Sequence, residues 1–158
     1  MIKGSGSVDD RARSLLVETL YTQPASLAIG AANGIISSAI AAWISGNLAI
    51  TVFAIVLTIV AIARIVFSYR QARMHPPEYS RKLEALYEMG AFTYAALIGL
   101  VAALCIWFKV DGQVQVMTVA VALCYGTGIA ARNAGRPIIA IGQLFLAQVP
   151  VIIALLSI

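Results

Sequence analysis

Charge is scarce in this chain. Only 11% of the 158 residues are charged, whereas 61% are hydrophobic and the mean hydropathy is +0.90. Soluble domains carry about 25% charged and about 45–50% apolar residues, so this chain has too little polar surface to cover a water-facing globule. The apolar residues also recur over nearly the whole length, which leaves no stretch for a separate soluble domain. The composition therefore predicts an integral membrane protein.

Residue types that carry catalysis or bind metals are equally sparse. His75 is the only histidine, and no cysteine, aspartate or second histidine stands near it at ligand spacing. Cys105 and Cys124 fall at depths about 10 Å apart in neighbouring predicted helices, which disfavours a disulfide. No carboxylate lies at mid-depth of an apolar block, where proton-coupled transporters need one. We therefore predict no catalytic residue, no metal site and no cofactor in this chain.

Five apolar blocks are long enough to cross a bilayer. A hydrocarbon core about 30 Å thick requires roughly 20 residues at 1.5 Å per residue. The blocks show no alternation of polar and apolar residues, which favours helices over strands. The sequence predicts an all-α integral membrane protein, a bundle of five transmembrane helices over residues 25–45, 48–68, 89–108, 114–131 and 138–158.

Two short amphipathic helices are expected at the membrane surface. The first lies in an N-terminal arm of residues 1–24, where Ser7 and Asp10 are typical of a helix start and apolar residues then share one face. The second follows the break at Pro76 and Pro77, where apolar residues repeat at helical spacing as far as Gly90. We expect this second helix to continue into the third span.

Basic residues predict the orientation. Ten of the 11 Lys and Arg residues fall on one side of the predicted bundle, and Lys109 alone falls on the other. Cytoplasmic segments carry such an excess, so the N-terminal arm is predicted to be cytoplasmic. An odd number of spans then places Ile158 outside, at the end of the apolar run Val149–Ile158, which has no aromatic or basic anchor. We therefore expect a longer protein, with a sixth helix and a cytoplasmic output domain after residue 158.

Polar residues gather at one depth of the bundle. Counted from the inner ends of the spans at 1.5 Å per residue, six of them lie roughly 6–12 Å inside the cytoplasmic edge. Hydrogen bonds between helices, worth about 0.6 kcal/mol each, are one interpretation of this cluster. The other is a pocket for a small ligand near the inner leaflet. The candidate pocket residues are Asn33, Thr93, Tyr94, Tyr125, Thr127 and Gln143.

Arg64 is the only charged residue within a predicted span, about one turn from the inner end of the second one. Its head group would either extend to the membrane surface or pair with Glu88, which is expected at a similar depth.

Small residues and one proline bear on helix packing. The GxxxG pattern in the first span suits a close helix contact, either within the chain or between two chains, and the glycines at the end of the fourth span suit a tight crossing. Pro150 removes a backbone donor and frees the carbonyl of Leu146. The packing candidates are Gly30, Gly34, Gly126 and Gly128.

The connection between the fourth and fifth spans is the most distinctive stretch. Tyr125–Pro137 contains the turn Arg132-Asn133-Ala134-Gly135-Arg136-Pro137, with a helix end, a glycine turn and a proline helix start. Together with Leu20–Leu27 and the order of hairpin, basic linker, hairpin and basic turn, it resembles the N-terminal multi-spanning membrane region of bacterial GGDEF-type diguanylate cyclases, some of which also carry an EAL domain. The chain itself has no GGDEF or EAL motif and no acidic set suited to Mg²⁺.

The resemblance implies a sensory input module in the bacterial inner membrane that controls cyclic-di-GMP synthesis by a cytoplasmic diguanylate cyclase domain outside this chain. It also implies a homodimer within the lipid bilayer, no nucleic-acid partner, and GTP and Mg²⁺ only in the output domain. A small transporter or channel subunit, or a structural subunit of a membrane complex, stays an alternative. The candidate signalling-turn residues are Arg132, Asn133, Gly135, Arg136 and Pro137.

Overall fold

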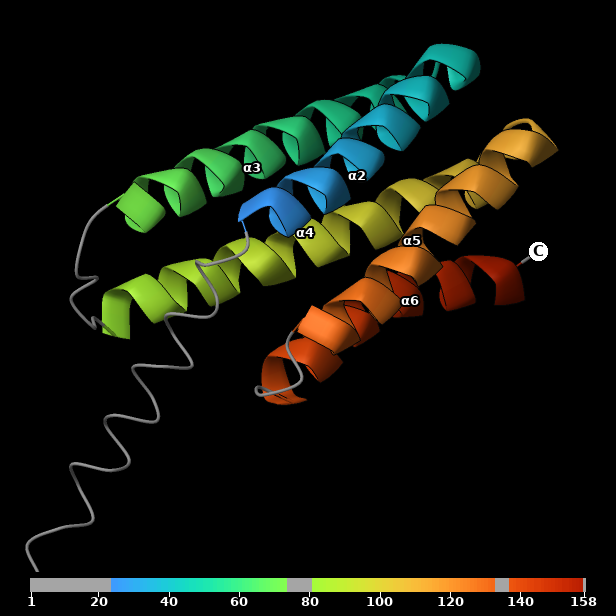
Figure 1. The fold of residues 1–158 in the computed structure, drawn as a ribbon. Coiled ribbons are helices and arrows are strands. Elements are labelled where there is room, and N and C mark those ends of the chain that lie inside the picture. The colour runs from blue at the N-terminus through green and yellow to red at the C-terminus, as the bar shows by residue number, and fades with distance from the viewer. Residues whose placement is uncertain (1–23, 74–80, 133–136, 158) are drawn as a thin grey trace, which may run out of the picture.

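The computed structural model describes residues 24–73, 81–132 and 137–157, which form five helices (Figure 1). The helices run in alternating directions, so α2, α4 and α6 begin at the end of the bundle where α3 and α5 stop. The all-helical prediction is confirmed for these residues, whereas the amphipathic helix predicted in the N-terminal arm lies outside them. The helices are α2 (Pro24–Ser45), α3 (Leu48–Arg73), α4 (Arg81–Trp107), α5 (Gly112–Arg132) and α6 (Pro137–Leu156).

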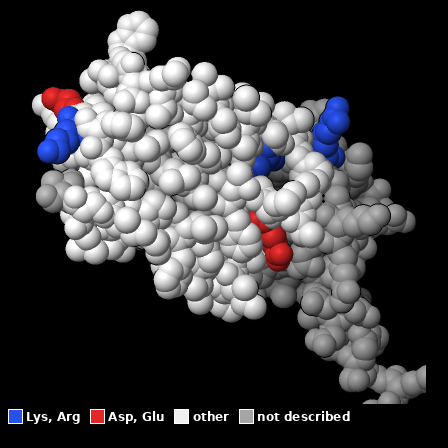
Figure 2. All heavy atoms as spheres, turned by 180° about the vertical axis from the view of Figure 1, so that it is seen from behind, with Lys and Arg blue, Asp and Glu red and all other residues white. Residues whose placement is uncertain are grey.

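Four of the helices are long and apolar enough to cross a membrane, over Leu27–Ser45, Leu48–Arg70, Ala85–Trp107 and Pro137–Leu156. Large apolar side chains are exposed on their outer faces, and Figure 2 shows that few charged residues interrupt the face it presents. An all-α, multi-pass membrane protein follows. Helix α5 has 21 residues. The side chains of its last four residues are not described, so the membrane crossing predicted over residues 114–131 stays a prediction.

Two helices extend beyond the predicted spans at the basic end. Helix α3 continues to Arg73 rather than stopping at Ser68, and α4 begins at Arg81 rather than at Met89. The amphipathic segment before the third span is the first part of α4 from Arg81 on, so the expected continuation of this helix into the third span is confirmed for the described residues. An apolar block marks only the part of a helix that lies in lipid, and no proline breaks the polar turns that precede it.

A two-residue turn closes the α2–α3 hairpin. Gly46 adopts a φ of 57°, and its amide donates to the carbonyl of Ala42 at 3.1 Å. Asn47 then caps α3, because its Oδ1 accepts the amide of Ala49 at 2.8 Å. A glycine at the helix end followed by an asparagine cap makes this turn tight.

The α4–α5 hairpin turns at the same end of the bundle. Lys109 has a φ of 49°, and its amide donates to the carbonyl of Ile106 at 3.0 Å. Asp111 caps α5, since its Oδ1 accepts the amide of Gln113 at 2.9 Å. Both hairpins are thus closed by short, hydrogen-bonded turns.

The positive φ of Gly46 makes the first turn sensitive to substitution. In Gly46→Ala, the new Cβ would occupy a left-handed conformation, which costs about 1 kcal/mol and should lower the melting temperature by about 2–4 °C. Gly112→Ala is the matched control, because open space surrounds a Cβ there and its φ is not positive. Equal melting temperatures of the two purified variants would contradict the turn geometry.

Helix α4 lies at the centre of the packing and contacts α2, α3, α5 and α6. It approaches the backbone of α6 closely at Gly99, where a Cβ would lie only 2.5 Å from the carbonyl oxygen of Ala147. In lipid, helices associate mainly through such close van der Waals contacts, which small residues permit. Around this centre, Ile50, Cys105 and Ile106 are almost fully buried in the half of the bundle near the two tight turns.

Candidate ligand-binding cavity

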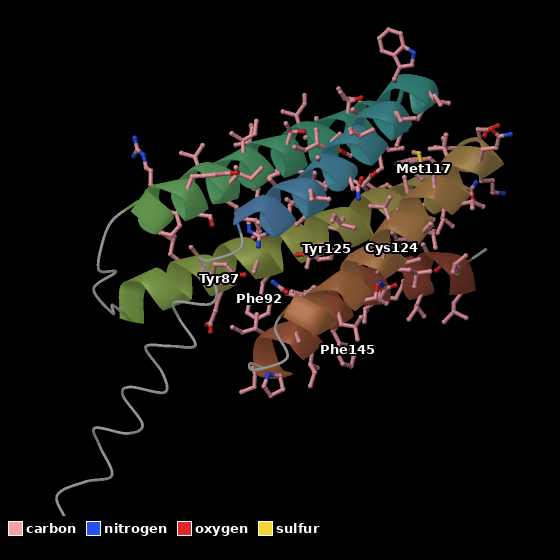
Figure 3. All side chains as sticks on the ribbon, viewed as in Figure 1. Tyr87, Phe92, Met117, Cys124, Tyr125 and Phe145 are labelled. Atoms are coloured by element: carbon pink, nitrogen blue, oxygen red, sulfur yellow. The ribbon has the colours of Figure 1, made fainter. Side chains whose placement is uncertain are left out.

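A cavity of about 410 Å³ lies between the helices and extends from Leu27 and Tyr87, near the starts of α2 and α4, to Met117, near the start of α5. All five helices contribute to its wall, and the volume is within the range of small-molecule sites. Figure 3 labels Tyr87 on α4 and Met117, Cys124 and Tyr125 on α5, which line it. Much of the wall is apolar. Its larger polar side chains are Asn33, Arg64, Tyr87, Tyr94, Tyr125 and Gln143.

Tyr94 joins α4 to α2 at the wall of this cavity. The side chain is 1% exposed, and its hydroxyl donates to the carbonyls of Gly30 and Ala31, at 3.2 and 3.3 Å. The hydroxyl can approach α2 only because residue 34 is glycine, since a Cβ at Gly34 would overlap the Tyr94 oxygen. This side of the GxxxG pattern is therefore occupied within the chain by α4.

Arg64 extends its guanidinium along the same wall. Its Cζ lies 5.2 Å from the centre of the Tyr94 ring, in cation–π range, and the Tyr94 ring meets Tyr125 edge-on at 5.3 Å. The stem of Arg64 passes Gly90, where a Cβ would be 3.3 Å from Cγ. Within the described ranges, no ion pair joins Arg64 to Glu88, so of the two alternatives for Arg64 the pairing with Glu88 is not present.

A second cavity of about 290 Å³ lies between α3 and α4. It shares Leu27, Arg64 and Tyr87 with the first cavity, so the two volumes meet at these side chains. Ser68 also lines the second cavity; its side chain is 2% exposed and its Oγ has no hydrogen-bond partner among the described residues.

The structure brings four of the six candidate pocket residues to the first cavity: Asn33, Tyr94, Tyr125 and Gln143. Thr93 lines the second cavity, and its hydroxyl donates to the Met89 carbonyl one turn earlier in α4. Thr127 lines neither cavity; it is exposed and donates to the carbonyl of Cys124 in its own helix. Arg64 and Tyr87 belong to the cavity wall although the sequence analysis did not place them there.

The remaining candidates are dispersed. A Cβ at Gly126 would meet a Leu144 side-chain carbon at 2.7 Å, so this glycine lies against α6. Gly30 and Gly128 line the first cavity, and open space surrounds a Cβ at each. In the candidate signalling turn, α5 ends at Arg132, whose side chain is not described, and α6 begins at Pro137. The other candidates, Asn133, Gly135 and Arg136, lie outside the described residues.

Comparisons with protein-family models, with curated proteins and with solved structures found no match to this chain. The cavity is therefore interpreted from its own chemistry. It offers one cation, hydroxyl groups and amides inside a helix bundle with an apolar outer surface. Such a wall suits the reversible binding of a small molecule with both polar and apolar parts.

Proposed function

We propose that this chain is a membrane-embedded sensory input module that binds a small ligand in the cavity between its five helices. The single observation that carries the proposal is that all five helices line this cavity. A ligand that contacts every helix favours one arrangement of the bundle over another, and such a population shift is how a binding site controls a distant domain.

Helices α5 and α6 offer the route from the cavity to an output domain. They lie on either side of residues 133–136 and are tied together where Nε2 of Gln148 donates to the carbonyl of Ala122 at 2.8 Å. A ligand that changes the α5–α6 arrangement would change the geometry of the basic turn between them. We propose that this turn passes the change to a cytoplasmic diguanylate cyclase domain, in the homodimer and in the bacterial inner membrane that the resemblance implies.

The transporter or channel alternative requires a polar path through the whole bundle. The layer next to the two tight turns is instead packed with side chains such as Ile50, Cys105 and Ile106, each at most 1% exposed. A cavity that ends at such a packed layer favours a binding module over a conduit.

The double substitution Asn33→Leu and Gln143→Leu in the intact natural protein tests the sensory role. It replaces two amides of the cavity wall by apolar groups of similar size, so cellular cyclic-di-GMP should change several-fold at equal protein level. Thr127→Val is the matched control, because Thr127 is polar at a similar predicted depth but lines neither cavity. Unchanged cyclic-di-GMP in the double variant would contradict the proposal, as would a reading frame without an output domain beyond codon 158.

A further inference from the structure

The position of Arg64 between the two cavities indicates what kind of ligand the module binds. Arg64 lines both volumes, about nine residues before the end of α3 and within the apolar span Leu48–Arg70. A guanidinium at this depth is costly in lipid unless it is paired or reaches water. Among the described side chains its recorded partner is the face of Tyr94, which attracts a cation but does not neutralise it.

The two cavities differ in what they offer on either side of this charge. The first has polar side chains in its wall besides Arg64, among them Asn33, Tyr94 and Gln143, so it suits a polar or acidic head group. The second is walled mainly by apolar side chains, including Val60 and Phe67. One volume therefore suits a charged head and the other an apolar chain.

The second cavity also reaches the lipid-facing surface. Its wall includes Leu86 and Met89, which are 45% and 62% exposed on the outer face of α4. A molecule dissolved in the membrane can thus enter between α3 and α4 without crossing water. The buried Ser68 Oγ, which has no hydrogen-bond partner in the described part of the chain, lies along this route and can donate to a passing or bound oxygen.

We infer that the ligand is an anionic amphiphile that enters from the membrane, with its acidic head against Arg64 and its hydrocarbon chain in the second cavity. The inference rests on the proposed function and names the chemistry of its ligand. Two sources share this chemistry, a free single-chain acid and an anionic phospholipid.

The test measures binding of radiolabelled oleate to the purified chain in phosphatidylcholine nanodiscs. We expect Arg64→Gln to weaken oleate binding about 10- to 100-fold, because a hydrogen-bonded charge pair is lost. Arg70→Gln is the matched control on the same helix, since Arg70 is exposed and lines neither cavity; it should change binding less than twofold. Oleyl alcohol, with the same chain and no charge, should compete with oleate only weakly.

Ala63→Trp tests the chain site independently of Arg64. Ala63 lines the second cavity only, so a large side chain there should fill the cavity and weaken oleate binding at least tenfold. Nanodiscs that contain phosphatidylglycerol identify the source: competition with oleate assigns the site to a phospholipid, and its absence assigns it to the free acid.

Three results would overturn the inference: oleyl alcohol competing as well as unlabelled oleate, Arg64→Gln and Arg70→Gln behaving alike, or neither oleate nor phosphatidylglycerol binding. The comparison of oleate with oleyl alcohol uses the unsubstituted chain, so it decides the question even if Arg64→Gln does not fold. Binding is measured without a signalling readout, so the ligand class can fail while the cyclic-di-GMP test still supports a sensory role.

Discussion

Replacing Gly99 by alanine should lower the melting temperature of the purified chain by about 6–12 °C. The new Cβ would lie 2.5 Å from the Ala147 carbonyl oxygen and 2.8 Å from that of Leu146. Both atoms belong to the α6 backbone and cannot rotate away, so the two helices must separate. Overpacking of this kind costs up to about 3 kcal/mol, and for a chain of this size each 1 kcal/mol corresponds to about 2–4 °C.

The proline in α6 explains why the approach at Gly99 falls at this position. Pro150 lies within the helix and has no N–H to donate to the carbonyl of Leu146, four residues earlier. That carbonyl faces Gly99, whose Cα–H groups can approach it closely, and such contacts contribute about 0.5–1 kcal/mol. Gly99 on α4 therefore lies against two α6 carbonyls, that of Ala147 and that of Leu146, and Pro150 removes the helical donor of the second.

Gly128→Ala is the control for this prediction. It makes the same chemical change in a helix, but nothing lies within 4 Å of the added Cβ, so the melting temperature should remain within about 2 °C of the parent value. Thermal unfolding of both variants in the same detergent gives the comparison. If the Gly99→Ala and Gly128→Ala variants had the same melting temperature, the described α4–α6 approach would be incorrect.

Replacing Gly34 by alanine should lower the melting temperature by about 4–8 °C, and the additional substitution Tyr94→Phe should partly reverse the effect. The alanine methyl would overlap the Tyr94 hydroxyl, which must then leave the carbonyls of Gly30 and Ala31. We expect a cost of about 2 kcal/mol. Gly30→Ala, four residues earlier in the same motif, meets open space and should change the melting temperature by less than about 2 °C.

A double-mutant cycle with Tyr94→Phe isolates this contact. The phenylalanine lacks the oxygen that the methyl would strike, and the nearest ring carbon would then be 3.1 Å away, which needs only a small shift. Tyr94→Phe alone should cost about 1 kcal/mol for its hydrogen bonds. The two substitutions affect the same contact, so the double variant should lose about 1 kcal/mol less unfolding free energy than the sum of the two single losses. Strict additivity of the two effects would show that Gly34 and Tyr94 do not meet.

The lengths of the apolar blocks and the distribution of charged residues predicted much of the fold, because both can be read from consecutive residues. The helix starts at Pro24 and Leu48 lie within one residue of the predicted spans, since a proline and a capping asparagine mark them in the sequence. The starts and ends at the basic side were less predictable. Arg81 begins α4 eight residues before the predicted span, because polar turns continue a helix without adding to an apolar block.

The sequence predicted the depth of the cavity residues in the bundle, but not which side of each helix they face. Counting residues gives the height of a side chain in the bundle, which brought Tyr94 and Gln143 to the right level. It does not give the direction around the helix axis, and Thr127 therefore sits at a similar depth but faces outward. Arg64 was missed for a related reason, because the usual preference of arginine for the membrane surface does not anticipate the ring of Tyr94 beside it. Single glycines such as Gly99 carry no spacing signal at all.

The two tight turns have a mechanical consequence for the opposite end of the molecule. The Gly46-Asn47 turn and the turn after Trp107 join each pair of helices at one end, while the cavity extends along the bundle from near these turns towards the opposite helix ends. For a helix about 30 Å long, a tilt of about 4° at the turn displaces the opposite end by about 2 Å, the scale of helix shifts in known switching proteins. Two helix hairpins joined in this way convert a small change in interhelical angle into a displacement of the helix ends, which a bound molecule can determine.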